Sequence, residues 1–156
     1  MKKVFLDTNI ILDVMTQRKP FNVPANAIMK MGIEGKIFLC ATPLTFANCT
    51  YILRSSYKLA NSINIIKAYK QYIYALTMDD EQCSKALNSD MPDFEDMLQY
   101  QAAIAAECDY IITRNEKHFP QEGTPVVSSE HFLSIFDQDG KALWLFKIGA
   151  DGKVRG

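Results

Sequence analysis

The sequence predicts a single α/β domain in which a parallel sheet is covered by helices on both faces. The chain has 156 residues, of which 48% are hydrophobic and 22% charged, and these values are typical of one soluble globular domain. Short apolar runs alternate with segments of helical periodicity as far as about residue 136. Strands that alternate with helices form parallel sheets, because parallel neighbours need a crossover connection.

The first third of the chain alternates between strand and helix signals. Residues 3–6 (KVFL) form a short apolar run that predicts a buried strand. Apolar residues at helical spacing predict a helix over 21–33, closed by one of the glycines near its end. A second strand is predicted over 36–40 (KIFLC), after which Thr42 caps a helix that has Pro43 at its first position.

The middle of the chain continues the alternation. Ser62 is expected to open a helix with an apolar face, and a short strand is predicted over 75–78. Asp79 or Asp80 then caps the next helix, and Pro92 ends it.

The last third contains the longest predicted helix and two further strands. The long helix covers 93–108, and its alanines suit close packing against a sheet. Strands are predicted over 109–113 and 125–127, and Ser129 is expected to cap a final helix. These elements complete a domain over residues 1–136.

Residues 137–156 differ from the rest. They contain turn residues around a short apolar run with the only tryptophan, Trp144, which predicts a C-terminal β-hairpin tail. The tail could pair with a partner or another subunit, or fold onto its own domain.

The composition indicates a protein of the reducing cytoplasm. The amino end begins like a signal peptide, but acidic residues interrupt its apolar stretch, and no window is long enough to cross a membrane. The four cysteines include no Cys-x-x-Cys pair, which fits neither a zinc site nor a secreted disulfide framework. We therefore expect buried thiols, a cytoplasmic location and no membrane association.

Charge is unevenly distributed along the chain although the net charge is only −1. Residues 14–78 hold eight Lys or Arg against one acid, whereas residues 79–139 hold fourteen acids against three Lys or Arg. The split is compatible with solvated helix faces that have no function. It is equally compatible with a basic surface for a polyanion beside an acidic pocket that needs cations.

Two acidic positions are candidates for chemistry. Asp7 directly follows the first strand, and the run Asp93-Phe94-Glu95-Asp96 opens the long helix. Asp7 could be an ordinary helix cap. The acidic run could simply complement the dipole of its helix. Ligands of parallel sheets gather at the carboxyl ends of the strands, however, and a helix leading into the fourth strand brings its amino end to the edge that holds Asp7. Converging carboxylates require a hard cation such as Mg²⁺ to offset their repulsion.

Four ordered segments resemble the motifs of PIN-domain proteins, which include the VapC-like toxins of prokaryotic toxin–antitoxin pairs. The segments are 6–13 (LDTNIILD), 42–48 (TPLTFAN), 93–99 (DFEDMLQ) and 109–119 (DYIITRNEKHF), and the resemblance runs from residue 3 to about 136. It implies a three-layer α/β/α sandwich, Mg²⁺ or Mn²⁺ as cofactor, and ribonuclease activity on RNA. It also implies an antitoxin protein as a possible partner, and we expect a homodimer.

The resemblance carries catalytic and metal-binding roles onto individual residues. Asp7 matches the first metal ligand, and Asp96 matches the acid at the start of the long helix. Beyond the resemblance, we expect Asp93 as a further metal ligand, because Asp93 and Glu95 could compensate for missing charge elsewhere in the site. Asn115 matches a position after the fourth strand that is often acidic, and Asn48 falls where many members have glutamate. An amide oxygen can coordinate Mg²⁺ but brings no charge, so both asparagines should weaken metal binding.

Polar neighbours of these positions are candidate substrate contacts. Thr8, Asn9 and Thr113 match polar positions around the site, and Thr113 or Arg114 is expected to contact phosphate. Tyrosines among the basic residues of 14–78 could stack on unpaired bases, or belong to the core.

Other functions remain as alternatives. A phosphatase of the haloacid dehalogenase type would need a second acid where Asn9 stands, and a receiver domain would carry its aspartate later in the chain. The alternative from another class is a PIN fold that binds RNA or a protein without cutting. The two histidines, His118 and His131, are interpreted as surface or loop residues.

Overall fold

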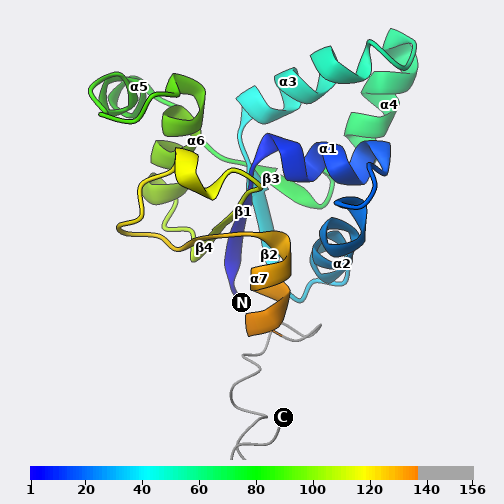
Figure 1. Ribbon diagram of the computed structural model, residues 1–156. Coiled ribbons are helices and arrows are strands. Elements are labelled where there is room, and N and C mark those ends of the chain that lie inside the picture. The colour runs from blue at the N-terminus through cyan, green and yellow to red at the C-terminus, as the bar shows by residue number, and fades with distance from the viewer. Residues whose placement is uncertain (137–156) are drawn as a thin grey trace, which may run out of the picture.

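The computed structural model describes residues 1–136, which form a five-stranded parallel sheet between helices (Figure 1). The strands are β1 (Lys3–Leu6), β2 (Phe38–Ala41), β3 (Ile73–Ala75), β4 (Tyr110–Ile112) and β5 (Val126–Val127). Their order in the sheet is β3-β2-β1-β4-β5, and every neighbouring pair is parallel. The predicted α/β class is confirmed. The predicted β-hairpin at 137–156 lies outside the described residues.

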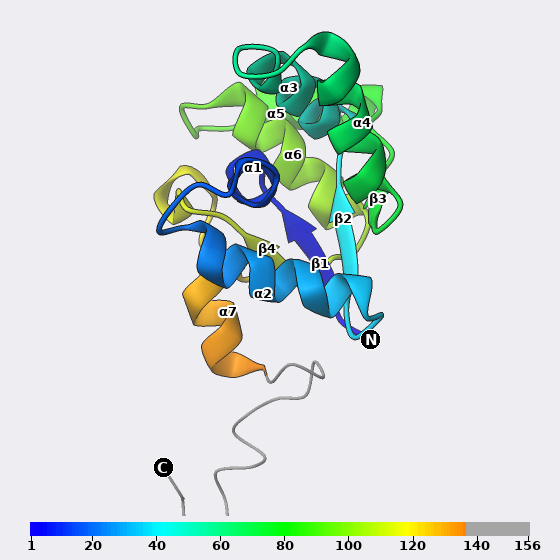
Figure 2. The same cartoon turned by 90° about the vertical axis from the view of Figure 1, so that its right-hand side faces the viewer.

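Helices cover both faces of the sheet, which gives the three-layer arrangement (Figures 1 and 2). Side chains alternate between faces along a strand, so Val4 and Leu6 belong to one hydrophobic core and Phe5 to the other. The first core is closed by α1 (Thr8–Thr16), α2 (Asn22–Ile33), α3 (Pro43–Leu53), α4 (Leu59–Lys70) and α7 (Ser129–Ile135). The second is closed by α5 (Asp80–Leu87) and α6 (Phe94–Ala105).

Two predicted helix caps, Thr42 and Asp79, are confirmed, and Asp93, predicted as the first residue of the long helix, is a third cap. Thr42, Asp79 and Asp93 precede α3, α5 and α6, and the side chain of each accepts a hydrogen bond from the backbone N–H three residues later. Such a bond satisfies a donor that the first helical turn leaves unpaired. Asp93 therefore fixes where α6 begins, and with it the position of the acidic run.

The glycine that follows α2 is Gly35, with φ +71° in the left-handed region. Gly32 lies inside the helix, where a Cβ would overlap the Leu39 side chain of β2. The absence of a side chain at Gly32 thus lets α2 lie close against the sheet.

Two predicted boundaries in the middle of the chain are wrong. Helix α4 begins at Leu59, and Ser62 lies within its first turn, where its hydroxyl donates to the Lys58 carbonyl. This back-bond is typical of a serine inside a helix. Strand β3 covers Ile73–Ala75 instead of 75–78, because pairing of Leu39 with Ile73 and of Ala41 with Ala75 fixes its register against β2.

Two further differences concern short helices. Ser128, not Ser129, caps α7, and its hydroxyl accepts from the His131 N–H. Helix α1, for which the sequence analysis named no element, starts at Thr8, directly after Asp7. The side chain of Asp7 is consequently held at the junction of a strand and a helix.

The expectation of buried thiols is confirmed for three of the four cysteines. Cys40, Cys49 and Cys108 are buried, whereas Cys83 is half-buried. Among residues 1–136, no helix is long and apolar enough to cross a membrane. Helices α3 and α4 of the basic stretch and helices α5 and α6 of the acidic stretch lie on opposite sides of the sheet (Figure 1), whereas α7, which also belongs to the acidic stretch, packs on the side of α3 and α4.

Candidate active site

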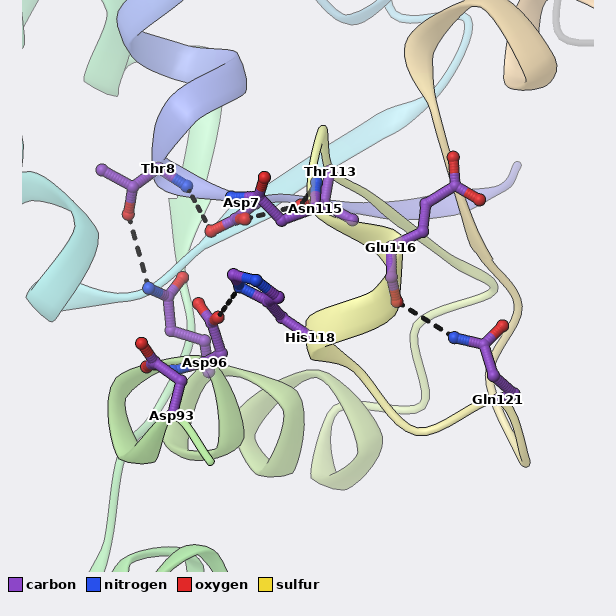
Figure 3. Close-up of polar contacts among 10 residues, drawn as sticks. Asp7, Thr8, Asp93, Asp96, Thr113, Asn115, Glu116, His118 and Gln121 are labelled. Carbon is purple, nitrogen blue, oxygen red and sulfur yellow. Dashed lines mark hydrogen bonds and ion pairs between the residues drawn. The ribbon is translucent and has the colours of Figure 1, made fainter. Parts of the chain in front are cut away.

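Asp7 is held at the carboxyl end of the central strand β1 and is only 4% exposed. As N-cap of α1, its Oδ1 accepts a hydrogen bond from the Thr8 N–H at 2.7 Å. Its Oδ2 accepts from the Thr113 hydroxyl at 2.7 Å, and Thr113 directly follows β4 (Figure 3). Both carboxylate oxygens are therefore oriented by neighbouring strands and the helix, as the parallel topology predicts.

The acidic run at the start of α6 faces Asp7 across the site (Figure 3). Asp96 Oδ2 lies 3.1 Å from Nδ1 of His118, which belongs to the 3-10 turn η1 (Glu116–His118). Glu95 Oε1 accepts a hydrogen bond of 2.6 Å from Asn48 Nδ2 on α3. The start of α6 is thus the meeting point of α3 and the loop after β4.

Burial and mutual repulsion raise the pKa values of three carboxyl groups here. Burial is the main cause for Asp7, and the charge of Asp93 adds to it, although hydrogen bonds from Thr113 and Thr8 act in the opposite direction. Burial, then Asp7 and Asp93, raises the pKa of Asp96 to about 6. Burial, Asp93 and Asp7 raise the pKa of Glu95. Carboxyl groups that oppose one another's ionisation are stabilised by a nearby cation.

The predicted metal ligands Asp7, Asp93 and Asp96 are therefore brought to one place, and oxygen donors of this kind suit Mg²⁺ or Mn²⁺. Within residues 1–136, no three His, Cys, Asp or Glu side chains are arranged closely enough to hold an ion as they stand. The donor chemistry fits a hard divalent cation, and small movements of exposed side chains would have to complete its coordination. The ligand set itself stays a prediction.

A buried polar frame lies behind the carboxylates. Gln99 of α6 is fully buried, accepts from the Thr45 hydroxyl at 3.1 Å and lies 3.4 Å from the Thr8 hydroxyl, to which it donates. Asn9 is half-buried, and its Oδ1 has no hydrogen-bond partner among residues 1–136. Thr8 therefore connects the frame to Asp7, and Asn9 keeps an unused acceptor close by.

The loop after β4 divides into two parts. The Thr113 hydroxyl accepts from the Asn115 N–H at 3.0 Å, and the Asn115 side chain is exposed. Arg114 turns to α1, where its Nε lies 2.9 Å from Oδ2 of Asp13. Residues 114–118 also line a surface pocket of about 400 Å³ beside Asp96. Thr113 and the Asn115 backbone are thus linked by hydrogen bonds to Asp7, whereas Arg114 forms an internal ion pair and also lines the pocket.

Sequence reasoning missed His118 and Gln99 as members of the site. His118 is far from Asp96 in sequence, and only the fold of the loop after β4 brings the two together. The one available signal was that His118 lies in the same motif segment as Thr113 and Asn115. Gln99 also lies within a quoted motif, but a glutamine at helical spacing gives no sign of burial.

Comparisons with known proteins place this geometry in context. A family model described as the PIN domain matches residues 3–117. A solved structure of VapBC2 from Rickettsia felis, bound to a DNA fragment from its promoter, is 14% identical with a TM-score of 0.56, covering 81% of this chain and 97% of that one. VapBC-1 from nontypeable Haemophilus influenzae is 18% identical with a TM-score of 0.58, covering 82% and 98%. The likeness to both structures is one of fold. No curated protein sequence is significantly similar.

Proposed function

The chain belongs to the PIN-domain family, and on that premise we propose that it is a Mg²⁺- or Mn²⁺-dependent endoribonuclease that hydrolyses RNA phosphodiester bonds. One observation carries the proposal. Burial, and after it the charges of neighbouring carboxylates such as Asp93, raises the pKa values of Asp7, Glu95 and Asp96 at the carboxyl end of the central strand. Such an arrangement is unfavourable without a cation, and a cation at this place would lie at the edge of the sheet where substrates bind.

Asp7, Asp96 and Asp93 would hold the ion. A bound divalent cation would supply positive charge against the scissile phosphate and would activate the attacking water. Thr8 and Thr113 fix the direction in which the Asp7 oxygens point, so this carboxylate loses little freedom on binding. The positions of Asn48 and Asn115 leave the site with fewer charges than many relatives have, so we expect weak metal binding.

RNA is the proposed substrate, with Thr8, Asn9, Thr113 and Arg114 as candidate contacts. The pocket of about 400 Å³ lined by residues 114–118 includes His118, which contacts Asp96, and its Lys117 and Arg114 outnumber the one acid, Glu116, which favours a phosphate-bearing ligand although Arg114 is also paired with Asp13. The Oδ1 atom of Asn9 is buried without a hydrogen-bond partner, so a contact between this side chain and RNA requires it to turn outward.

We further propose that the protein is the toxin of a toxin–antitoxin pair in the cytoplasm, with an antitoxin protein as partner and a homodimer as the assembly. The support is the likeness of fold to two VapBC proteins. A small open reading frame next to the gene, whose product copurifies with this chain, is the expected finding.

Cleavage of a mixed RNA pool tests the central proposal. The full chain is incubated with Mn²⁺, with Mg²⁺ and with EDTA, beside Asp7→Asn and the matched control Asp80→Asn. Asp80 is an exposed acid on α5, outside the site. We expect metal-dependent cleavage by the wild type and by Asp80→Asn, and its loss in Asp7→Asn. Cleavage that persists in Asp7→Asn would indicate a contaminating nuclease or a different site.

A binding module without nuclease activity is the second candidate. It is favoured by the Asn48–Glu95 hydrogen bond, because a neutral amide satisfies the acid where many relatives place a second carboxylate. If the wild type cuts no RNA with any metal and Asn48→Glu alone gains activity, this second candidate replaces the first.

A further inference from the structure

We propose that residues 142–146 of this chain (ALWLF) dock into an apolar groove on its own domain, formed by β2 and β3 on the face of the sheet that carries α6. The proposal goes beyond the nuclease function and does not rest on it. The groove opens at the amino end of the strands, whereas Asp7 lies at the carboxyl end of β1. It assigns a place to a segment for which the sequence left two destinations open.

The groove is a hollow of about 490 Å³ beside the edge strand β3. It is lined by Met1, Lys3, Phe38, Tyr74 and Leu76. A second hollow of about 350 Å³ shares Lys3, Tyr74 and Leu76 with the first, and continues it between β3 and the alanines at the end of α6. The two together form one groove with mainly apolar walls.

The aromatic wall of this groove is a part of the sheet that the helices leave uncovered. Side chains two residues apart on a strand lie on the same face, so Phe38 lies on the same face as Cys40, and Tyr74 pairs with Cys40 across the strands. Cys40 is fully buried under the α6 side of the sheet, whereas Phe38 is 41% and Tyr74 is 58% exposed. The two exposed rings lie 5.7 Å apart. A contiguous exposed apolar patch of this kind is typical of a docking surface.

The tail leaves the domain at the end of the sheet where the groove opens. Phe136 is the last residue that the structure describes, and its ring centroid is 5.3 Å from that of Tyr110 on β4. Tyr110 pairs with Val4 of β1. The preceding residue, Lys3, pairs with Phe38 of β2. Phe136 and Phe38 therefore lie near the amino ends of strands that are two places apart, on opposite faces of the sheet.

The length of the tail is sufficient for this route. Two strand spacings and the passage from one face of the sheet to the other amount to roughly 20 Å. The eight residues from Phe136 to Trp144 span at most roughly 26–29 Å when extended. Because the tail is tethered beside the groove, its effective concentration there is in the millimolar range, about that of other short linkers. At equal affinity, it would therefore displace a separate partner present at micromolar concentration.

The chemistry of residues 142–146 matches that of the groove. The five residues are consecutive and apolar, and Lys141 and Lys147 flank them. The indole of Trp144 can pack against the Phe38–Tyr74 pair, because aromatic side chains bury much apolar surface and attract one another in offset or edge-on contact. The flanking lysines can stay in water while the apolar run is buried.

Fluorescence of the full chain tests the proposal, because Trp144 is the only tryptophan and reports on the tail alone. Emission spectra and acrylamide quenching are recorded for the native and the urea-unfolded chain. Phe38→Lys and Tyr74→Lys place a charge in the groove at positions that are already exposed. Tyr51→Lys is the matched control, because it changes a 77% exposed tyrosine on α3, on the other side of the sheet (Figure 1). Urea unfolding followed by circular dichroism verifies that all variants fold.

We expect native Trp144 to be shielded from acrylamide and to emit at shorter wavelength than in urea. Phe38→Lys and Tyr74→Lys should each lose most of this shielding and shift the emission to longer wavelength, whereas Tyr51→Lys should match the wild type. Equal quenching of the native and unfolded chains would overturn the proposal. Shielding that persists in both groove variants would also overturn it, because the tail would then be covered elsewhere.

A mixing experiment separates docking on the same chain from docking on a second copy. Tyr74→Lys, which keeps Trp144, is mixed with an excess of Trp144→Phe, which has an intact groove and emits no tryptophan fluorescence. We expect Trp144 of the Tyr74→Lys chain to stay open to acrylamide, because each intact groove holds its own tail. Shielding restored by the excess chain would show that the groove takes the tail of a second copy, and would overturn the proposal.

Discussion

Replacing Arg114 with methionine should destabilise the protein strongly, because it leaves a buried carboxylate without its partner. The Asp13 side chain is 1% exposed, and Arg114 contacts it twice, with Nε 2.9 Å from Oδ2 and Nη2 donating to Oδ1 at 3.2 Å. The guanidinium also lies 4.0 Å above the ring of Phe21. Methionine preserves most of the apolar stem and removes only the charge and the donors.

The expected loss is about 3 kcal/mol. Breaking a buried ion pair typically costs about 3–5 kcal/mol, and the lower end applies because Arg114 is 26% exposed, so that water screens part of the interaction. For a chain of this length the loss corresponds to a fall in Tm of roughly 6–12 °C. The Asp13→Leu/Arg114→Met double variant should recover most of it, because two apolar side chains of similar size need no partner.

The pH dependence supplies an independent check. Burial raises the pKa of Asp13 even beside Arg114, so removing the guanidinium should raise it further. A carboxyl group with a raised folded-state pKa gains stability as pH falls through that pKa, because the folded protein then binds the extra proton. The deficit of Arg114→Met should therefore shrink on acidification. Urea unfolding followed by circular dichroism measures both quantities.

A deficit below about 1 kcal/mol, or one that does not vary with pH, would refute this reasoning, since surface pairs contribute no more than that. Unchanged stability combined with a loss of RNA affinity would instead identify Arg114 as a phosphate contact. The measurement thus separates the two roles that the structure and the sequence suggest for this side chain.

Three further predictions follow from charge and packing. Asp96→Asn should stabilise the metal-free protein by about 1–3 kcal/mol at pH 8, as measured by urea unfolding. The reason is that the ionised Asp96 carboxylate, whose pKa is raised to about 6, is unfavourable in the folded wild type. This gain should vanish below about pH 4, where the carboxyl group is protonated in the folded and in the unfolded wild type. Gly32→Ala should cost about 1–2 kcal/mol in the same assay, because overlap with the buried Leu39 outweighs better helix propensity. RNA affinity, measured by filter binding, should fall steeply with added salt. The double variant Arg54→Glu/Lys58→Glu should bind RNA more weakly and with a smaller salt dependence. RNA binding that changes neither with salt nor in this variant would make the basic stretch an ordinary solvated face.

Local signals in the sequence predicted well where the strand ends and helix starts of the site lie. Asp7 follows an unbroken apolar run, and Thr42 and Asp93 are followed by helical periodicity, so each position depends on a few neighbouring residues. The strand order and the right-handed crossovers of parallel sheets then bring the start of α6 to the carboxyl end of β1.

Non-local contacts were not predictable in the same way. Serine often caps helices, but Ser62 lies inside α4, where its side chain is buried and its hydroxyl donates to the Lys58 carbonyl. The register of β3 depends on β2, more than thirty residues earlier. His118 joins Asp96 only because η1 folds back towards α6. Arg114 reaches Asp13 on α1, and no local pattern indicates that pairing.

The central place of β1 in the sheet determines when the site can exist during protein synthesis. β1 is made first, yet it pairs with β4, so that Val4 meets Tyr110, and Asp7 depends on Thr113 for one of its hydrogen bonds. At roughly 5–20 residues per second, a ribosome needs roughly 5–20 s to extend the chain from Asp7 to His118. A shorter nascent chain has the first aspartate but neither the threonine that orients it nor the imidazole beside Asp96. Incomplete translation products therefore carry no assembled centre, and any activity of this site requires that nearly the whole domain has been synthesised.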